Sequence, residues 1–91
     1  MYSKELLTRL RNEIPISIVI GDILDMPSKT TEGYFRFLCP VCKEFDTATN
    51  PKTNLARCFG CERNFNPIDM VMVVKHMNFK DAVEYLTDIA R

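Results

Sequence analysis

The cysteine pattern constrains this chain more than any other feature of its sequence. All four cysteines of the 91 residues fall into two pairs, Cys39 with Cys42 and Cys58 with Cys61, and each pair encloses two residues. Two such pairs at this separation are typical of a tetrathiolate zinc site. Four thiolates at about 2.3 Å complete the zinc shell and leave no position for water. We therefore predict one bound Zn²⁺ with a structural role.

Two disulfides, a thioredoxin-like redox pair and iron in the same cage are the alternatives to zinc. The first twenty residues carry five charged side chains and no long apolar run, so we expect neither a signal peptide nor a membrane span. We expect a cytoplasmic protein with no membrane partner, and a reducing cytoplasm disfavours disulfides. Iron remains an alternative metal for the four-cysteine site, because thiolates also bind iron.

The short length of the chain predicts that its fold needs stabilisation beyond a hydrophobic core, such as a bound metal. A chain of 91 residues buries limited apolar surface, and we expect a single domain over residues 1–91. Metal binding contributes on the order of 10–16 kcal/mol to zinc-finger peptides, which exceeds the stability of most small domains. Twelve Lys and Arg balance twelve Asp and Glu, so any affinity for nucleic acid would need a local basic face.

Helices are expected at both ends of the chain. Apolar residues at helical spacing predict an amphipathic helix from Tyr2 to Ile14, within an N-terminal helical segment of residues 1–21 that includes a helical turn near 16–20. Residues 66–91 are predicted to form two more helices.

The start of the first of these two helices is well marked. Asn66 is an N-cap residue, Pro67 occupies the first helical position and Asp69 the third. This helix is expected to end near His76. It is apolar nearly all round, so we expect it to be buried between other elements or against a partner.

Residues 22–63 are predicted to form the zinc ribbon. Strands are expected at about 22–26, 34–38 and 55–59, with a polar turn at 27–33 and a loop at 43–54. Alternation along the strands places Tyr34 and Arg36 on one face, and Arg57 opposite Cys58. We therefore expect Arg36 and Arg57 on the outer face of one small antiparallel sheet.

Several motifs in chain order resemble a known family. They are Leu-Cys-Pro at 38–40, Cys-Phe-Gly-Cys at 58–61, Asn-Pro-Ile-Asp at 66–69 and Phe-x-x-Ala-Val-x-x-Leu at 79–86. Together they resemble the zinc-binding domain at the N-terminus of bacterial DnaG-type DNA primases. That family most often has histidine as its second metal ligand, where this sequence has Cys42.

The resemblance implies a small α+β fold, with a zinc ribbon on an antiparallel sheet and flanking helices. It also implies contact with single-stranded template DNA during primer synthesis. In that family the polymerising site lies in a separate domain, so we expect a non-catalytic module with no catalytic residues. A primase polymerase domain and a replicative helicase are further candidate partners.

A single-strand contact surface is expected on the strands. Such surfaces combine cations that follow the backbone with aromatic rings on which bases stack. The candidate DNA-binding residues are Tyr34, Arg36, Lys52 and Arg57. The alternative is a solvated strand face, which carries Arg and Tyr because both tolerate exposure. The corresponding alternative function is a zinc-ribbon protein-interaction or regulatory domain without template binding.

Overall fold

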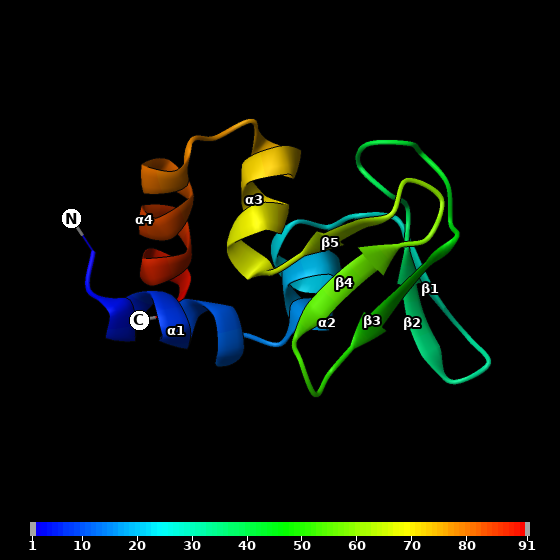
Figure 1. The fold of residues 1–91 in the computed structure, drawn as a ribbon, viewed down its shortest axis with the longest axis horizontal. Helices are drawn as coiled ribbons and strands as arrows, with labels where there is room; N and C mark the ends of the chain where they lie inside the picture. Colours follow the sequence, from blue (N-terminus) through cyan, green and yellow to red (C-terminus); the bar gives the residue numbers. More distant parts are fainter. Residues whose placement is uncertain (1, 91) are drawn as a thin grey trace.

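Helices and strands occupy opposite ends of an elongated molecule (Figure 1). The computed structural model describes residues 2–90, and its principal extents are 38 × 24 × 21 Å. Three helices gather at one end, a two-stranded hairpin forms the other, and a second sheet lies between them. The predicted small α+β fold, with an antiparallel ribbon and flanking helices, is confirmed, although its strands form two sheets.

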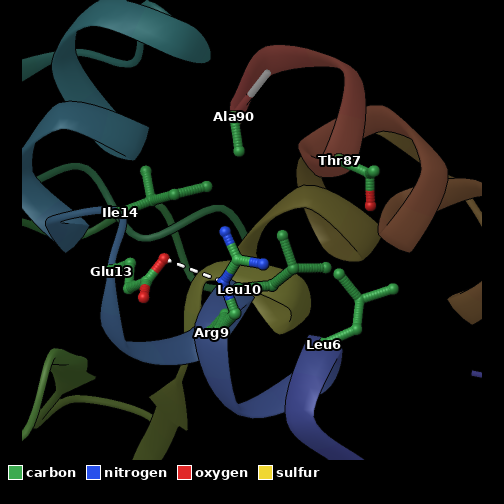
Figure 2. Close-up of a pocket in the computed structure, with 7 residues that line it drawn as sticks. All are labelled: Leu6, Arg9, Leu10, Glu13, Ile14, Thr87 and Ala90. Carbon is green, nitrogen blue, oxygen red and sulfur yellow. Dashed lines mark hydrogen bonds and ion pairs between the residues drawn. The ribbon is translucent and has the colours of Figure 1, made fainter. Parts of the chain in front are cut away.

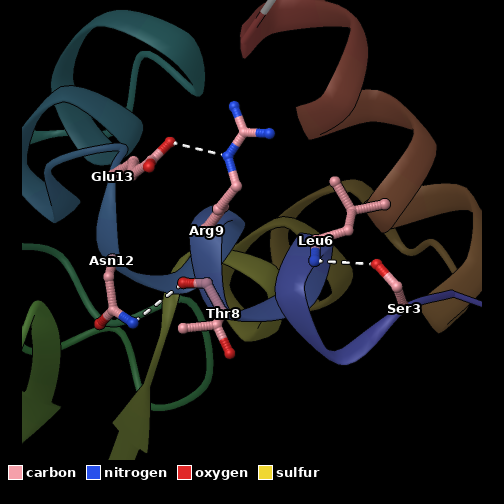
Figure 3. Close-up of polar contacts among 6 residues, drawn as sticks. All are labelled: Ser3, Leu6, Thr8, Arg9, Asn12 and Glu13. Atoms are coloured by element: carbon pink, nitrogen blue, oxygen red, sulfur yellow. Dashed lines mark hydrogen bonds and ion pairs between the residues drawn. The ribbon is translucent and has the colours of Figure 1, made fainter.

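The first helix, α1 (Lys4–Asn12), forms where the apolar spacing predicts it. Its N-terminus is capped by Ser3, whose Oγ accepts a hydrogen bond of 3.1 Å from the Leu6 N–H (Figure 3). Near its end, Arg9 Nε lies 3.2 Å from Glu13 Oε2, a favourable i,i+4 ion pair. Because both groups are well exposed, this ion pair contributes little to stability.

The predicted strand near residues 22–26 is wrong. The short helix α2 (Ile16–Ile18) runs directly into a π-helix, η1 (Val19–Ile23), and the Leu24 N–H donates to the Val19 carbonyl at 2.9 Å. Ile16, Val19 and Ile20 are all buried, and their spacing of three and four residues marks one face of a helix. Burial of this face continues the helix beyond the turn predicted at 16–20 and into the segment assigned to a strand.

The first strand of the first hairpin begins later than predicted, and its turn is shorter. Strand β1 (Ser28–Thr31) pairs antiparallel with β2 (Tyr34–Phe37), so the expected polar turn at 27–33 is wrong. The true turn is Glu32-Gly33, and both residues have positive φ, 54° and 80°. Two central residues with positive φ form the turn type that suits a two-residue hairpin. Three of the four β1 residues are exposed, and such a strand shows no apolar alternation.

A second sheet follows, with the strand order β3 (Thr47–Asn50), β4 (Leu55–Cys58) and β5 (Arg63–Phe65). The predicted loop at 43–54 is wrong where it covers β3. The predicted single sheet is also wrong, because residues 2–90 form two separate sheets.

Threonine side chains of β3 join the two sheets. Thr47 is fully buried, and its Oγ1 accepts from the Phe37 N–H at 2.9 Å and donates to the Phe37 carbonyl at 2.7 Å. Thr49 Oγ1 donates to the Phe35 carbonyl at 3.1 Å. These bonds replace the backbone ladder that would otherwise connect β2 to β3, and they satisfy backbone groups that would be costly to bury unpaired.

The first C-terminal helix begins as predicted. Asn66 and Asp69 form a reciprocal capping box at the start of α3 (Pro67–Lys75), and His76 ends the helix in a left-handed conformation. Helix α3 packs against α1, α4 (Phe79–Ala90), η1 and β5, which confirms that this apolar helix is buried between other elements.

One buried amide ties the helical end to the second sheet. Asn54 lies in the β3–β4 turn with φ 56°, and its Oδ1 accepts from the Ile16 N–H at 2.8 Å. Its Nδ2 donates to the carbonyls of Arg11, at 2.6 Å, and Ile14, at 2.8 Å. Asparagine suits this position because it tolerates the left-handed conformation and supplies both donor and acceptor groups.

Candidate metal centre and adjoining surface

The four cysteine sulfurs converge on one point. All four Sγ atoms lie within 4.8 Å of one another. Those of Cys39 and Cys61 are 3.7 Å apart, and those of Cys42 and Cys58 are 3.4 Å apart. Sulfurs placed tetrahedrally around a metal at 2.3 Å would be about 3.8 Å apart. The cluster therefore has the dimensions of a tetrathiolate metal site, and its cysteines are free thiols.

Two short turns aim the sulfurs inward. In the first, the Val41 N–H donates to Cys39 Sγ at 3.4 Å, and in the second the Cys61 N–H donates to Cys58 Sγ at 3.5 Å. The second turn follows β4 directly, because Cys58 is the last residue of that strand. Backbone amides that point at sulfur favour the thiolate form, which is the form that binds metal.

The residue that follows each cysteine pair has the same left-handed backbone conformation. Lys43 follows the first pair with φ 63°, and Glu62 follows the second with φ 56°. The left-handed region favours glycine, so two long side chains there indicate that the surrounding structure imposes this conformation. After Glu62 the chain reverses into β5, which pairs with β4.

Without a cation the cluster cannot hold four thiolates at neutral pH. Burial, together with hydrogen bonding to Cys58, raises the pKa of the Cys61 thiol to about 12. At Cys58 burial also acts to raise the pKa, but the Cys61 N–H and neighbouring thiols donate hydrogen bonds and lower it to about 7. The pKa of Cys42 is raised by its hydrogen bond to Cys58. A bound metal would remove these protons, because metal binding requires deprotonated ligands.

Two of the candidate DNA-binding residues lie on β2. The Arg36 guanidinium lies 5.6 Å from the centroid of the Tyr34 ring, a cation–π arrangement, and Tyr34 is 53% exposed. Arg36 is also held inside the fold, since it donates 2.7 Å hydrogen bonds to Thr31 Oγ1 and to the Thr47 carbonyl. Arg36 therefore helps to join the two sheets, a role that sequence reasoning missed.

Arg57 belongs to the other sheet. It lies on β4, where it donates to Asn64 Oδ1 at 3.3 Å and approaches the Phe59 ring to 5.7 Å. The expected placement of Arg36 and Arg57 on one sheet is therefore wrong, because β2 and β4 belong to separate sheets. Lys52 is exposed in the β3–β4 turn, and its N–H donates to Asn50 Oδ1 at 3.0 Å.

Comparison with known proteins identifies the family of this ribbon. The sequence profile of the CHC2 zinc finger family, the zinc ribbon of DnaG-type primases, matches residues 2–91. The chain belongs to the CHC2 zinc finger family. A DNA primase from Streptomyces coelicolor is 30% identical to it over 79 residues, which cover 85% of the chain. The matched region spans only 12% of the length of that primase.

This CHC2 zinc finger differs in charge from a site with one histidine ligand. Cys42 supplies a thiolate, so four thiolates around a divalent metal carry a formal charge of minus two. Lys43 lies beside this centre, and its Nζ donates to the Pro40 carbonyl at 3.1 Å. Arg63, just after the second turn, lies 5.5 Å from the Phe65 ring. Two cations thus flank the cysteine cluster.

Sequence reasoning also missed Lys29 as a surface cation. Lys29 pairs with Arg36 in the β1–β2 register, so the two side chains share a face of the hairpin. Its Nζ lies 4.7 Å from the centroid of the Phe45 ring. The residue would have been found if the polar segment before Tyr34 had been assigned as a strand.

A further pocket lies at the opposite end of the molecule (Figure 2). It measures about 200 Å³ and opens between α1 and the end of α4, beside the Arg9–Glu13 ion pair. Leu6, Leu10 and Ile14 give it an apolar lining. Among the described helices, none combines the length and apolar character that a membrane crossing requires.

Proposed function

We propose that this domain is a zinc-dependent, non-catalytic DNA-binding module of a primase, which contacts single-stranded template in the cytoplasm. A separate polymerase domain would synthesise the primer on that template. The observation that carries the proposal is a set of two cation–aromatic pairs in the ribbon, Arg36 with Tyr34 on β2 and Arg57 on β4 with Phe59 in the second cysteine turn. Stacking faces beside cations are what single-strand binding requires.

Zinc is the metal that we propose for the cluster. Four sulfurs within 4.8 Å of one another suit Zn²⁺, and iron is the competing occupant because thiolates bind it as well. Four protein ligands leave no coordination position for water, so the metal would hold the ribbon together rather than activate a substrate. Metal analysis of the purified protein would distinguish the two metals by content, and an iron-thiolate centre would also absorb visible light.

Fluorescence anisotropy with labelled oligonucleotides tests the DNA proposal. We expect weak binding that prefers single strands to duplex and falls with salt. Each phosphate contact on a single strand contributes about 0.7 to the slope of log affinity against log salt. Lys52→Ala is therefore expected to reduce that slope by about 0.7. Lys80→Ala, at an exposed helix position of α4, is the matched control and is expected to leave the slope unchanged.

A second set of variants removes the cation–aromatic surface. Arg57→Ala together with Lys52→Ala is preferred to a change at Arg36, because the Arg36 hydrogen bonds also support the fold. We expect the double variant to keep its metal and lose most of its affinity for single strands. Binding unaltered in this variant, or the absence of binding at low salt, would overturn the DNA proposal.

The alternative is a protein-interaction or regulatory ribbon. It is favoured by two exposed apolar side chains at the tips of the cysteine turns, Val41, which is 43% exposed, and Phe59, which is 49% exposed. A primase polymerase domain or a replicative helicase is the partner that we propose for such a surface. Binding of that partner by a chain that binds no oligonucleotide would favour this alternative.

A further inference from the structure

A groove between the two hairpin turns is larger than the pocket described above. It measures about 650 Å³, against about 200 Å³ for the pocket between α1 and α4. Sites for small ligands usually measure about 300–1,000 Å³. The turns of the β1–β2 and β3–β4 hairpins point in the same direction (Figure 1), and the groove lies between them and the start of α2.

The lining of this groove is uncharged. It is made by polar, apolar and aromatic residues, and Tyr34 is its exposed aromatic side chain. Ile16 and Asn54, both buried, also line it. A phosphate would gain little in such a groove, because no charged side chain lines it among residues 2–90. A flat, neutral group with hydrogen-bonding edges is the better match.

Two amides in the lining have groups available for such an edge. Asn12 Nδ2 donates to the Thr8 carbonyl at 2.9 Å, and Asn50 Oδ1 accepts from the Lys52 N–H at 3.0 Å. Within residues 2–90 these bonds leave the Asn12 Oδ1 acceptor and the Asn50 Nδ2 donors without a partner. By contrast, the Asn54 amide is fully used inside the fold.

Cations lie outside the groove, where a nucleic-acid backbone would run. Lys52 follows Pro51, which lines the groove, and its side chain is exposed. The Arg36 guanidinium lies 5.6 Å from the Tyr34 ring. An aromatic ring inside the groove with cations at its border separates base contacts from phosphate contacts.

From this arrangement we propose that the groove holds one nucleobase of the single-stranded template. The base stacks on Tyr34, and Asn12 and Asn50 contact its edge. This inference rests on the proposed function and deepens it, because it assigns the ribbon a preference for particular bases at one template position. Lys52 contacts the adjoining phosphate. The groove residues therefore determine base preference, and Lys52 contributes to the salt-dependent affinity.

The test compares strands with and without a base, using the full, zinc-loaded chain. One strand of about eight nucleotides carries a single central base on an otherwise abasic backbone, and its control is abasic throughout. We expect the base to tighten binding about 5- to 150-fold, the range for one base stacked on an aromatic side chain. Tyr34→Ala is expected to remove this difference, and Tyr34→Phe to retain it.

Each outcome separates this inference from the proposed function. Equal, salt-dependent binding of both strands would overturn the nucleobase groove and leave the DNA-binding function standing. No binding of either strand would overturn both. A free nucleoside monophosphate that binds as tightly as the strand would overturn the template assignment, since the groove would then serve a mononucleotide.

Two further measurements locate the base and test how it is read. NMR titration with the single-base strand is expected to shift the amide signals of Ser17 and Gly33, which line the groove, and the abasic strand is expected to shift them less. Asn50→Ser keeps an acceptor for the Lys52 N–H and removes the amide nitrogen. We expect it to change the order of preference among the four bases. An unchanged order in both Asn50→Ser and Asn12→Ala would overturn the reading of the base edge.

Discussion

The ribbon and the helical end of this molecule are stabilised in different ways. At the helical end, α1, α3 and α4 bury side chains that are at most 3% exposed, among them Leu10, Val71 and Leu86. In the ribbon, β1 is largely exposed, and Phe37, Ala56 and Phe65 are buried in the same core. Apolar burial therefore stabilises both regions, and the ribbon depends in addition on its metal centre and on hydrogen bonds between its sheets.

This difference explains where binding groups are found. A strand that is held by metal ligands and side-chain hydrogen bonds can keep its outer face polar and aromatic, as β2 does with Tyr34 and Arg36. A helix that is held by apolar packing cannot give up its buried face in this way. The pairs of Arg36 with Tyr34 and Arg57 with Phe59 accordingly lie in the ribbon, and the groove lies between its hairpin turns and the start of α2.

Removal of the metal is expected to have the largest effect on the ribbon relative to the helical end. Chelation, or Cys58→Ser, is expected to destabilise the ribbon by on the order of 10 kcal/mol. Hydrogen exchange would show loss of amide protection in β2 to β5 before α3 and α4. Lower pH acts in the same direction, because protons compete with the metal for thiolates, so metal release is expected as pH falls. Simultaneous loss of protection in both regions would show that they form one cooperative unit.

Truncation in the helical core perturbs the other region. Leu86 is fully buried on α4, and Leu86→Ala is expected to cost about 2–5 kcal/mol of unfolding free energy. Ile89→Ala, on the same helix but at a 42% exposed position, is the control and is expected to cost much less. Both variants should retain metal in the folded state. Denaturant titration with metal analysis would check this, and metal loss in folded Leu86→Ala would contradict the separation of the two regions.

The buried Asn54 amide tests how the two regions are joined. Asn54→Ala removes the bonds to Ile16, Arg11 and Ile14 and leaves buried backbone groups unpaired, at about 1–3 kcal/mol. Asn54→Gly removes the same bonds but suits the φ of 56°, so it isolates the contribution of the side chain. Thermal unfolding of both variants gives the comparison. Stabilities equal to that of the unchanged protein would show that the amide does not couple the regions.

The helices and the metal cluster could be predicted because their signals are local. The capping residues Asn66 and Asp69 lie three positions apart, and each cysteine pair spans four residues, so short-range geometry determines both features. The strand predicted near residues 22–26 failed because the helical segment with the buried Val19 and Ile20 continues to Ile23. Tertiary packing overrides local propensity at such positions.

The sequence by itself determined that four thiols could enclose a metal and that capped, amphipathic helices would accompany the ribbon. Only the tertiary structure decided that the strands form two sheets, that Thr47 and Arg36 join those sheets, and that a groove opens beside Tyr34. The physical reason is sequence distance. Strands β1 and β3 are short and largely polar, so they are stabilised by pairing and by side-chain bonds to segments that no local pattern identifies.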